Sequence, residues 1–341
     1  PPQAAARAEE IAKRILLELR EPFVLDGQLH HSTLSIGLTV FKGQSESADE
    51  LIKRGDLAMY QAKAAGRDRM RFYDPHMQAQ VAARAALEVD MRAGLRQGQF
   101  ELFYQPQVVQ GRITGAEALL RWRHPQRGFV SPGEFIPLAE DCGLILPLGE
   151  WVLQDACARL AQWAQRPGLS HLSLSVNVSP REFHQSGFVA QVLQALASTG
   201  ADARHLKLEL TESLLLQDVE DTIDKMGQLR AYGVGFSLDD FGTGYSSLAY
   251  LKRLPLDELK IDQSFVRDVL TDPNDAAIAR TIVALGTSLG LRVTAEGVET
   301  KEQRAFLERA HCHAWQGYLL SAPMVAVAFE HLVLARGDVP I

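Results

Sequence analysis

The first part of the chain alternates between helical and extended patterns of apolar side chains. Residues 4 to 19 place apolar side chains on one face of a helix, which predicts an amphipathic helix there. The runs from Phe23 to Leu25 and from Thr33 to Phe41 lie on either side of the dipeptide Asp26-Gly27. Because Asp-Gly adopts positive φ at little cost, these runs predict a β-hairpin.

A second helical pattern runs from Ala48 to Ala65, and a strand pattern from Met70 to Tyr73 follows it. Residues 76 to 97 are rich in Ala, Arg, Glu and Gln and have no turn residue before Gly94, which predicts a connecting helix. We therefore expect a small α+β segment at residues 1–75, a connecting helix at 76–94 and a larger domain at 95–341.

The larger domain carries eight short apolar runs of strand length, with helical patterns between the later ones. The runs are Glu101 to Val109, Ile113 to Trp122, Leu172 to Val178, Leu206 to Leu210, Gly235 to Asp239, Glu258 to Ile261, Arg292 to Ala295 and Trp315 to Leu319. Such an order predicts an α/β fold, a TIM-like (β/α)8 barrel. Only Gln110 to Arg112 separate the first two runs, too few residues for a parallel crossover, so we expect one antiparallel strand near the start.

Composition limits the setting and the partners. With 35 Lys and Arg against 42 Asp and Glu, the formal net charge is −7, which argues against a nucleic acid polymer as partner. No apolar run reaches the length of a membrane span and the first residues show no export signal. We therefore expect a cytoplasmic fragment without membrane contact, which could be the cytosolic part of a larger sensor protein. The three cysteines lack paired spacing and are expected to be reduced thiols.

Acidic and amide side chains stand at the ends of the predicted barrel strands, where the reactive groups of such barrels lie. They are Glu117, Asn177, Glu209, Asp239, Asp240 and Glu296, with Lys260 and Gln316 at comparable positions. A single one of these residues is often a helix cap, but five carboxylates drawn together need a cation among them. Oxygen ligands without Cys or His favour Mg²⁺ or Mn²⁺ over zinc.

The formal charge of this group favours two metal ions. Its five carboxylates, with the cationic Lys260 and Arg121, carry −3, which repels an anionic phosphodiester. Two divalent ions bring the charge to about +1, and a hydroxide that bridges two ions about 4 Å apart is a strong nucleophile at neutral pH. We therefore expect metal-dependent hydrolysis of a phosphodiester.

With these residues in view, the chain from residue 95 to about 335 resembles the EAL family of cyclic di-GMP phosphodiesterases. The resemblance is carried by FYQP at Phe103 to Pro106, EALLRW at Glu117 to Trp122, EFIPLAE at Glu134 to Glu140, SVNVS around Asn177, ELTES from Glu209, DDFGTGYSSL from Asp239, KIDQSF from Lys260, AEGVE ending at Glu299 and QGYLLSAP from Gln316.

The resemblance implies that cyclic di-GMP is hydrolysed to linear pGpG, which lowers the level of this second messenger. It implies catalytic roles for Lys260, Glu296, Glu117 and Asp239, and metal ligation by Glu117, Asn177, Glu209, Asp239, Asp240 and Glu296. Lys260 would position or activate the water, and Glu296 is the candidate general base as well as a ligand. Gln105, Leu119, Arg121 and Gln316 would contact the substrate. The implied cofactor is Mg²⁺ or Mn²⁺, and Ca²⁺ is expected to inhibit because its coordination is looser.

The resemblance further implies a mobile loop after the paired aspartates, formed by Phe241, Gly242, Thr243 and Gly244. This loop would support Asp240, be steadied by Glu212 and relay contacts of a homodimer to the metal site, while Asp262 and Glu299 would orient ligands. A flexible turn in which Ser246 caps a helix is the simpler alternative.

Residues 1–75 resemble the C-terminal half of a GGDEF domain, through SIGL at Ser35 to Leu38 and LAMYQAKAAGRDR at Leu57 to Arg69. The GGDEF string is absent, so we expect a packing or linking role and no synthesis of cyclic di-GMP. Two alternatives to the enzyme stay open, a receptor that binds cyclic di-GMP and signals through the dimer loop, and a metal-dependent barrel lyase or isomerase. All the expected metal and lysine positions are filled, which favours the enzyme.

Overall fold

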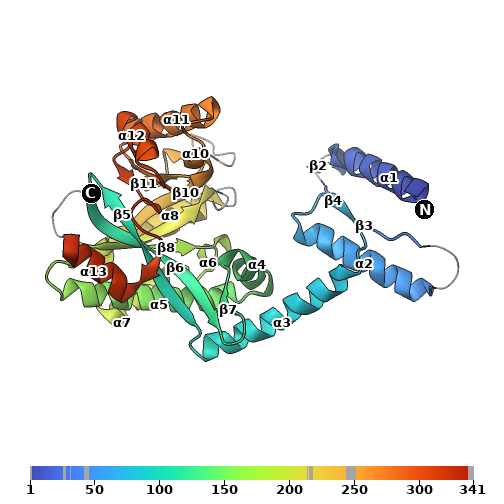
Figure 1. The fold of residues 1–341 in the computed structure, drawn as a ribbon, viewed down its shortest axis with the longest axis horizontal. Helices are drawn as coiled ribbons and strands as arrows, with labels where there is room; N and C mark the ends of the chain where they lie inside the picture. The colour runs from blue at the N-terminus through green and yellow to red at the C-terminus, as the bar shows by residue number, and fades with distance from the viewer. Residues whose placement is uncertain are drawn as a thin grey trace. The chain divides into compact units, whose positions relative to one another are not determined.

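In a computed structural model, the chain folds into two units, Pro1–Asp90 and Met91–Ile341 (Figure 1). The structure describes residues 2–25, 28–30, 32–41, 46–212, 214, 218–242 and 251–336. None of the helices in these ranges combines the length and the apolar character that a membrane crossing needs.

The first unit is a small α+β segment. Its elements are α1 (Pro2–Arg20), β1 (Phe23–Leu25), β2 (Gln28–His30), β3 (Ser35–Leu38), α2 (Ala48–Ala64), β4 (Arg69–Phe72) and most of α3 (His76–Arg96). The three predicted helices are confirmed. Ser47 precedes α2 and its side chain accepts a hydrogen bond from the Glu50 amide, which satisfies one of the unpaired donors at the helix start.

The hairpin of this unit has a different second strand from the one predicted. β1 pairs antiparallel with β2, and Leu25 stands opposite Gln28. A two-residue connection pairs the residues directly on either side of it, which leaves the run from Thr33 to Phe41 outside the hairpin. From that run, β3 instead pairs in parallel with β4, and α2 forms the crossover between them. Asp26 and Gly27 lie outside the described residues.

The second unit is built around a closed barrel. In the described part of the chain its strands pair in the order β5-β13-β12-β11-β10-β9-β8-β6 and back to β5. They are β5 (Phe100–Val109), β6 (Arg112–His124), β8 (Ser173–Val178), β9 (Leu206–Thr211), β10 (Gly235–Phe241), β11 (Glu258–Ile261), β12 (Arg292–Ala295) and β13 (Ala314–Trp315). β5 runs antiparallel to both neighbours and the other pairs are parallel. The expected TIM-like barrel with one antiparallel strand near its start is confirmed.

Two short strands extend this sheet and one barrel strand is shorter than predicted. β7 (Gly128–Val130) pairs with β6, and β14 (Met324–Val325) pairs with β5; neither was predicted. Of the predicted run from Trp315 to Leu319, only Trp315 lies in a strand. After it, the backbone bonds to a loop instead of a strand, because the Val298 amide donates to the Gln316 carbonyl at 3.1 Å. A Cβ on Gly317 would lie 2.2 Å from the Val298 carbonyl oxygen, so the chain turns toward this loop at a glycine.

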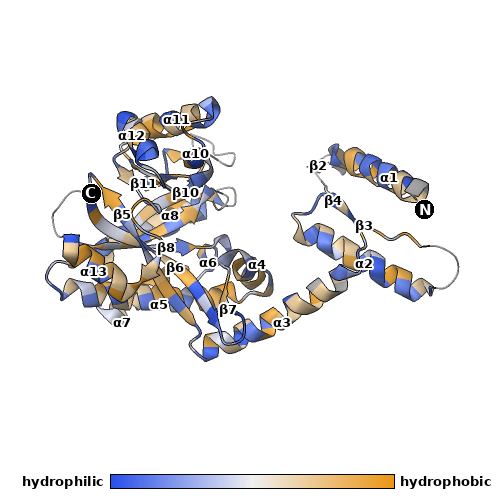
Figure 2. Cartoon of the chain, viewed as in Figure 1, coloured by the Kyte–Doolittle hydropathy of each residue, from blue (hydrophilic) through white to orange (hydrophobic). Residues whose placement is uncertain are grey.

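Helices cover the outside of the barrel strands (Figure 1). They are α4 (Pro132–Cys142), α5 (Ile145–Ala164), α6 (Pro180–Phe183), α7 (Phe188–Thr199), η1 (Ala203–His205), α8 (Val219–Ala231), α10 (Gln263–Arg267), α11 (Pro273–Leu289), α12 (Lys301–Arg309) and α13 (Ala326–Arg336). α11 ends at Leu289, and Gly290 caps it with a left-handed φ of 72°. Figure 2 shows α11 mainly in the tan and orange of apolar residues, and its buried face carries Ala276, Ala279, Ile282 and Val283.

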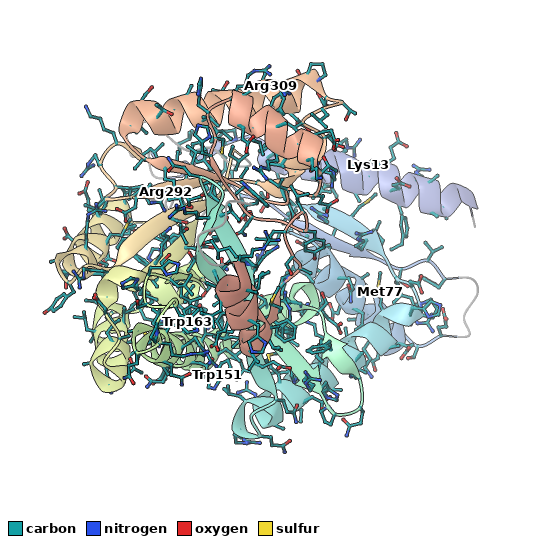
Figure 3. The ribbon with its side chains drawn as sticks, turned by 60° about the vertical axis from the view of Figure 1, so that its left-hand side comes forward. Lys13, Met77, Trp151, Trp163, Arg292 and Arg309 are labelled. Atoms are coloured by element: carbon teal, nitrogen blue, oxygen red, sulfur yellow. The ribbon has the colours of Figure 1, made fainter. Side chains whose placement is uncertain are left out.

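The last helix is anchored to the first barrel strand through buried aromatic residues. Tyr104 of β5 packs against Trp163 of α5 and Phe329 of α13, with ring centroids 5.7 Å and 6.1 Å apart. Trp163 lies beside α13 (Figure 3), and its Nε1 donates to the Glu330 carboxylate at 2.9 Å. These contacts hold the end of the chain against β5, where the barrel closes.

Candidate active site

Strand register brings the predicted site residues to one end of the barrel. Asn177 on β8 stands opposite Glu209 on β9, and Asp239 on β10 stands opposite Thr211, the last residue of β9. β6 is the next strand beyond β8, and its Glu117 stands opposite Gln105 of β5. Side chains from separate strands therefore gather at the carboxyl-terminal end of the parallel strands, as predicted for this fold.

Lys260 of β11 lies at the centre of this group. Its side chain is 0% exposed, and its Nζ forms ion pairs with Glu209 Oε2 at 2.7 Å, Asp239 Oδ1 at 3.2 Å and Glu117 Oε2 at 3.4 Å, and also with Glu296. Burial alone would lower the pKa of this lysine, but the four carboxylates outweigh it and hold the pKa well above the ordinary value. The raised pKa favours the charged ammonium form of Lys260 in the barrel interior.

Glu117 is a carboxylate surrounded by hydrogen-bond donors. Asn177 Nδ2 donates to its Oε1 at 2.6 Å, and Gln316 Nε2 and Lys260 Nζ donate to its Oε2 at 2.5 Å and 3.4 Å. Burial raises the pKa of Glu117, but the Lys260 charge and the two amides more than offset this, so the pKa lies below the ordinary value. Glu117 is therefore ionised and oriented in advance.

The pKa values of Glu209 and Glu296 are raised, in contrast to that of Glu117. Burial, with the charges of Glu117 and Asp239, raises the pKa of Glu209 to about 8 despite its contact with Lys260. Burial and the same neighbours raise the pKa of Glu296 well above its ordinary value. Among the described residues, Glu209 Oε1 is buried and has no hydrogen-bond partner. The cluster thus contains more negative charge than Lys260 balances.

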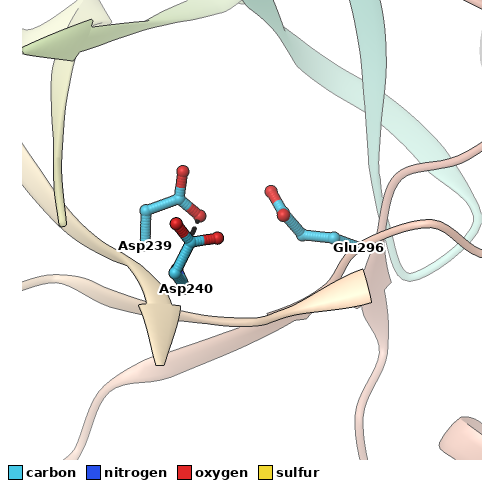
Figure 4. Close-up of side chains that lie close together, drawn as sticks. All are labelled: Asp239, Asp240 and Glu296. Atoms are coloured by element: carbon cyan, nitrogen blue, oxygen red, sulfur yellow. Dashed lines mark hydrogen bonds between the residues drawn. The ribbon is translucent and has the colours of Figure 1, made fainter. Parts of the chain in front are cut away.

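A bulge in β10 turns two consecutive aspartates toward the site. Between Leu238 and Phe241, β10 has one residue more than its partner β11, and Asp240 has a φ of 54°. The Asp240 amide donates to Asp239 Oδ1 at 3.0 Å, and Figure 4 shows the carboxylate of Glu296 facing those of the two aspartates. Burial and the adjacent Asp239 charge raise the pKa of Asp240 to about 6.

The residues present fit a hard metal ion. Asp239, Asp240 and Glu296 each offer a carboxylate oxygen, and these atoms lie within 4.8 Å of one another. The unpaired Oε1 of Glu209 is a further buried acceptor that lacks a positive partner. Oxygen-only ligands of this kind suit Mg²⁺ or Mn²⁺. Excess negative charge, an orphaned acceptor and matching ligand chemistry together support a divalent cation site.

The apparent affinity for Mn²⁺ is expected to rise as the pH increases from about 6 to about 8, because the pKa of Asp240 is raised to about 6 and that of Glu209 to about 8. Below these values the two carboxyl groups hold protons, which a metal ion must displace; above them they are free to bind it. Isothermal titration calorimetry with Mn²⁺ at several pH values measures the change. An affinity that is constant or falls over this range contradicts the assignment of these two ligands.

The predicted substrate residues line the rim beside the carboxylates. Leu119 and Arg121 follow Glu117 at intervals of two along β6, so the three side chains share a face. The Arg121 guanidinium lies 5.7 Å from the centre of the Phe103 ring. A cavity of about 320 Å³ opens next to them, lined by Leu119, Arg121, Asn177, Pro132, Ile136 and Leu148 among others. An arginine next to an apolar cavity suits a ligand that combines a phosphate with a flat apolar part.

The structure describes the first half of the predicted loop after Asp240. The Gly242 amide donates to Glu212 Oε2 at 3.3 Å, and Phe241 is buried in the core. Glu212 therefore contacts the start of the loop from the end of β9. Thr243 and Gly244 lie outside the described residues, as does Ser246, so the loop's role and the Ser246 cap stay predictions.

Asp262 and Glu299 lie at the starts of the next elements. Asp262 Oδ1 accepts hydrogen bonds from the amide and the hydroxyl of Ser264 and so caps α10. The exposed Glu299 donates its amide to Gln303 Oε1 at 2.8 Å, at the start of α12. Asp262 also interacts with Asp240 and contributes to its raised pKa. The predicted orienting roles of Asp262 and Glu299 stay predictions.

Gln107 on β5 joins the site although sequence reasoning did not single it out. Its side chain is buried, and its Nε2 donates to Gln316 Oε1 at 3.1 Å. The signal was present in the alternation of FYQPQ, which puts Phe103, Gln105 and Gln107 on one face of the strand. A glutamine in such a run is as common on a solvated face, so only the closed barrel shows that it points inward.

Comparisons with known proteins cover both units. Residues 88–323 match the family model of the EAL domain, and residues 1–69 match that of the diguanylate cyclase, GGDEF domain. The bifunctional diguanylate cyclase/cyclic di-GMP phosphodiesterase MucR of Pseudomonas aeruginosa is 44% identical over 328 residues, which are 96% of this chain and 47% of that protein. The cyclic di-GMP phosphodiesterase NbdA of the same species is 40% identical over 330 residues, 96% of this chain and 42% of that protein. The chain thus spans less than half the length of these relatives.

The barrel is also similar to a solved structure. The chain is similar to the PaMucR phosphodiesterase in its c-di-GMP complex, with a TM-score of 0.70 and 48% sequence identity. The likeness covers 72% of this chain and 99% of that one, so it extends over nearly the whole of the solved chain.

Proposed function

The chain belongs to the EAL-domain family, and we propose that its barrel is a metal-dependent phosphodiesterase that hydrolyses cyclic di-GMP to linear pGpG. The observation that carries the proposal is the fully buried Lys260, held among four carboxylates at the barrel end, with Arg121 on the same face of β6 as Glu117. The relatives named cyclic di-GMP phosphodiesterases support the choice of substrate.

Two divalent ions, Mg²⁺ or Mn²⁺, would be held by Glu117, Asn177, Glu209, Asp239, Asp240 and Glu296. When bound, they would balance the carboxylates, attract the anionic diester and make a water molecule acidic enough to attack phosphorus. Lys260 keeps its positive charge inside this cluster and would hold the attacking water in line by donating to it. Glu296 has two roles in the proposal, as a ligand and as the acceptor of the water's proton, and its raised pKa suits the second role.

The substrate side of the proposal depends on β5 and β6. Arg121 would donate two parallel hydrogen bonds to a phosphate, with Gln105 and Leu119 beside it. Gln105 is buried and stands opposite Glu117, so a diester bound by Arg121 would reach the carboxylates along the same face of β6. Opening one phosphodiester of the ring would then leave a linear dinucleotide, pGpG.

Incubation of the purified protein with cyclic di-GMP and Mg²⁺ is expected to yield linear pGpG, measured by ion-exchange chromatography of the nucleotides. Chelation should stop the reaction, and added Mg²⁺ or Mn²⁺ should restore it, because the carboxylates alone repel the diester. A Lys260→Met preparation purified in the same way controls for a contaminating phosphodiesterase.

Other outcomes of this assay point away from the proposal. Unchanged nucleotide together with tight binding would favour a cyclic di-GMP receptor. Ca²⁺ is expected to inhibit, since its larger radius and looser coordination hold water poorly. A rate with Ca²⁺ equal to that with Mg²⁺ contradicts this part of the metal assignment.

The remaining parts of the chain have supporting roles in the proposal. Residues 1–75 carry no GGDEF string and would pack or link, with residues 76–94 as the connecting helix to the phosphodiesterase barrel at 95–341. A homodimer through the barrel, with Phe241 and Gly242 at the start of the relaying loop, stays a prediction.

A further inference from the structure

We propose that Gln107 is a positioning residue that keeps the Gln316 side-chain amide turned so that its NH₂ group faces Glu117. The inference rests on the proposed function for its kinetic part, and on the metal site alone for its binding part. Gln107 and Gln316 come from opposite ends of the barrel sequence and meet inside it, where both side chains are buried.

The backbone of Gln316 is fixed, but its side-chain amide has two possible orientations. The Gln316 amide N–H donates to the Ala295 carbonyl at 2.9 Å, and its carbonyl accepts from Val298 at 3.1 Å. The side-chain Nε2 donates to Glu117 Oε2 at 2.5 Å and to Glu296 Oε1 at 3.2 Å. A flip of the amide would aim its carbonyl oxygen at both carboxylates and leave Lys260 as the remaining donor to these two oxygens.

Gln107 favours one of these orientations from the other side. Its Nε2 donates to Gln316 Oε1 at 3.1 Å and to Ser175 Oγ at 3.4 Å. Once cations occupy the carboxylates, these orient Gln316 less strongly. A carboxylate attracts the N–H groups of the amide, but a cation bound to it attracts the amide's carbonyl oxygen. The donor from Gln107 does not depend on metal occupancy. It therefore keeps Gln316 a donor to Glu117 when the site is loaded.

Gln107→Met removes this donor and keeps the side-chain length. We expect kcat for cyclic di-GMP hydrolysis and the affinity for Mn²⁺ each to fall about 10- to 100-fold, the usual range for residues that orient a metal ligand, with KM little changed. Steady-state kinetics and Mn²⁺ calorimetry measure the two effects. The same substitution in a Gln316→Met background should change either quantity by no more than about 2-fold, because the amide that Gln107 positions is gone.

Gln99→Met is the matched control. Gln99 is half-buried, whereas Gln107 is buried. The Gln99 side chain also makes a hydrogen bond, which Oε1 accepts from Trp122 Nε1 at 3.1 Å, but it lies six residues before Gln105, about 20 Å along an extended chain. Its loss is expected to lower thermal stability and to leave kcat and Mn²⁺ affinity unchanged. An equal effect of Gln107→Met with and without Gln316 would overturn the proposal, as would wild-type kinetics and Mn²⁺ affinity in the single variant.

The role of Gln107 can be tested even if the enzyme is inactive or the variant does not fold. If wild-type protein binds Mn²⁺ but does not hydrolyse cyclic di-GMP, the proposed function fails. The Mn²⁺ affinities of the single and double variants then still decide the role of Gln107. If Gln107→Met does not fold, hydrogen exchange of the side-chain amides of Gln107 and Gln316 in the wild-type protein carries the test. Slow exchange at both is expected, and fast exchange at Gln107 contradicts the inference.

Discussion

Replacing Lys260 by methionine is expected to lower kcat for cyclic di-GMP hydrolysis about 100- to 1000-fold, the range for loss of one preorganised donor at a reacting centre. Lys260 Nζ is fully buried and contacts four carboxylates, so its loss removes both the donor for the attacking water and the internal cation that orders the ligands. Steady-state kinetics with Mg²⁺ measures the change. Full turnover by the variant would refute the role given to Lys260.

Lys207→Met is the control for damage to the barrel. Lys207 precedes Glu209 by two residues on β9, so it lies on the same inner face one layer further from the site, where it pairs with the buried Glu258. Breaking a buried ion pair costs about 3 to 5 kcal/mol of unfolding free energy, and we expect that loss here without a change in kcat. If Lys207→Met lost as much activity as Lys260→Met, the effect at Lys260 would reflect the barrel and not the site.

Much of the barrel could be predicted because its strands are short runs with buried apolar residues. β11 and β12 coincide with the runs Glu258 to Ile261 and Arg292 to Ala295, in which apolar residues alternate with polar ones, as the two faces of a strand do. The antiparallel β5 followed from the short connection after Val109. In such a barrel, a side chain at the carboxyl-terminal end of a parallel strand lies at the end where the site forms. The candidate carboxylates could therefore be named from the order of the strands along the sequence.

The features that could not be predicted depend on contacts between distant segments. The bulge that turns Asp240 inward arises from the register between β10 and β11, and an Asp-Asp pair carries no sign of it. The early end of β13 depends on hydrogen bonds with the loop at Val298. Gln107 acquires its place only when β5 meets β13. Residue type allowed the candidate chemical groups to be named, while the barrel's closure decides how they are oriented.

Replacing Glu117 by glutamine is expected to weaken Mn²⁺ binding and to lower kcat/KM for cyclic di-GMP by roughly 1000-fold, which corresponds to the several kcal/mol that a metal ion contributes to a phosphoryl transition state. Glu117 accepts from Asn177 on one oxygen and from Gln316 and Lys260 on the other. A glutamine has one acceptor oxygen, so its NH₂ group must face one of these donors, and it brings no negative charge to a cation.

The matched control is Glu258→Gln. Glu258 is 3% exposed against 5% for Glu117, and it likewise accepts from a lysine, Lys207, and from a second donor, Thr294. Both substitutions take a buried carboxylate away from a lysine in the barrel interior, which costs about 1 to 3 kcal/mol of unfolding free energy. Chemical denaturation should therefore show similar losses of stability for the two variants. Only Glu117→Gln should lose Mn²⁺ affinity and turnover, because only Glu117 belongs to the cluster around Lys260; equal losses of turnover in both would assign the effect to packing.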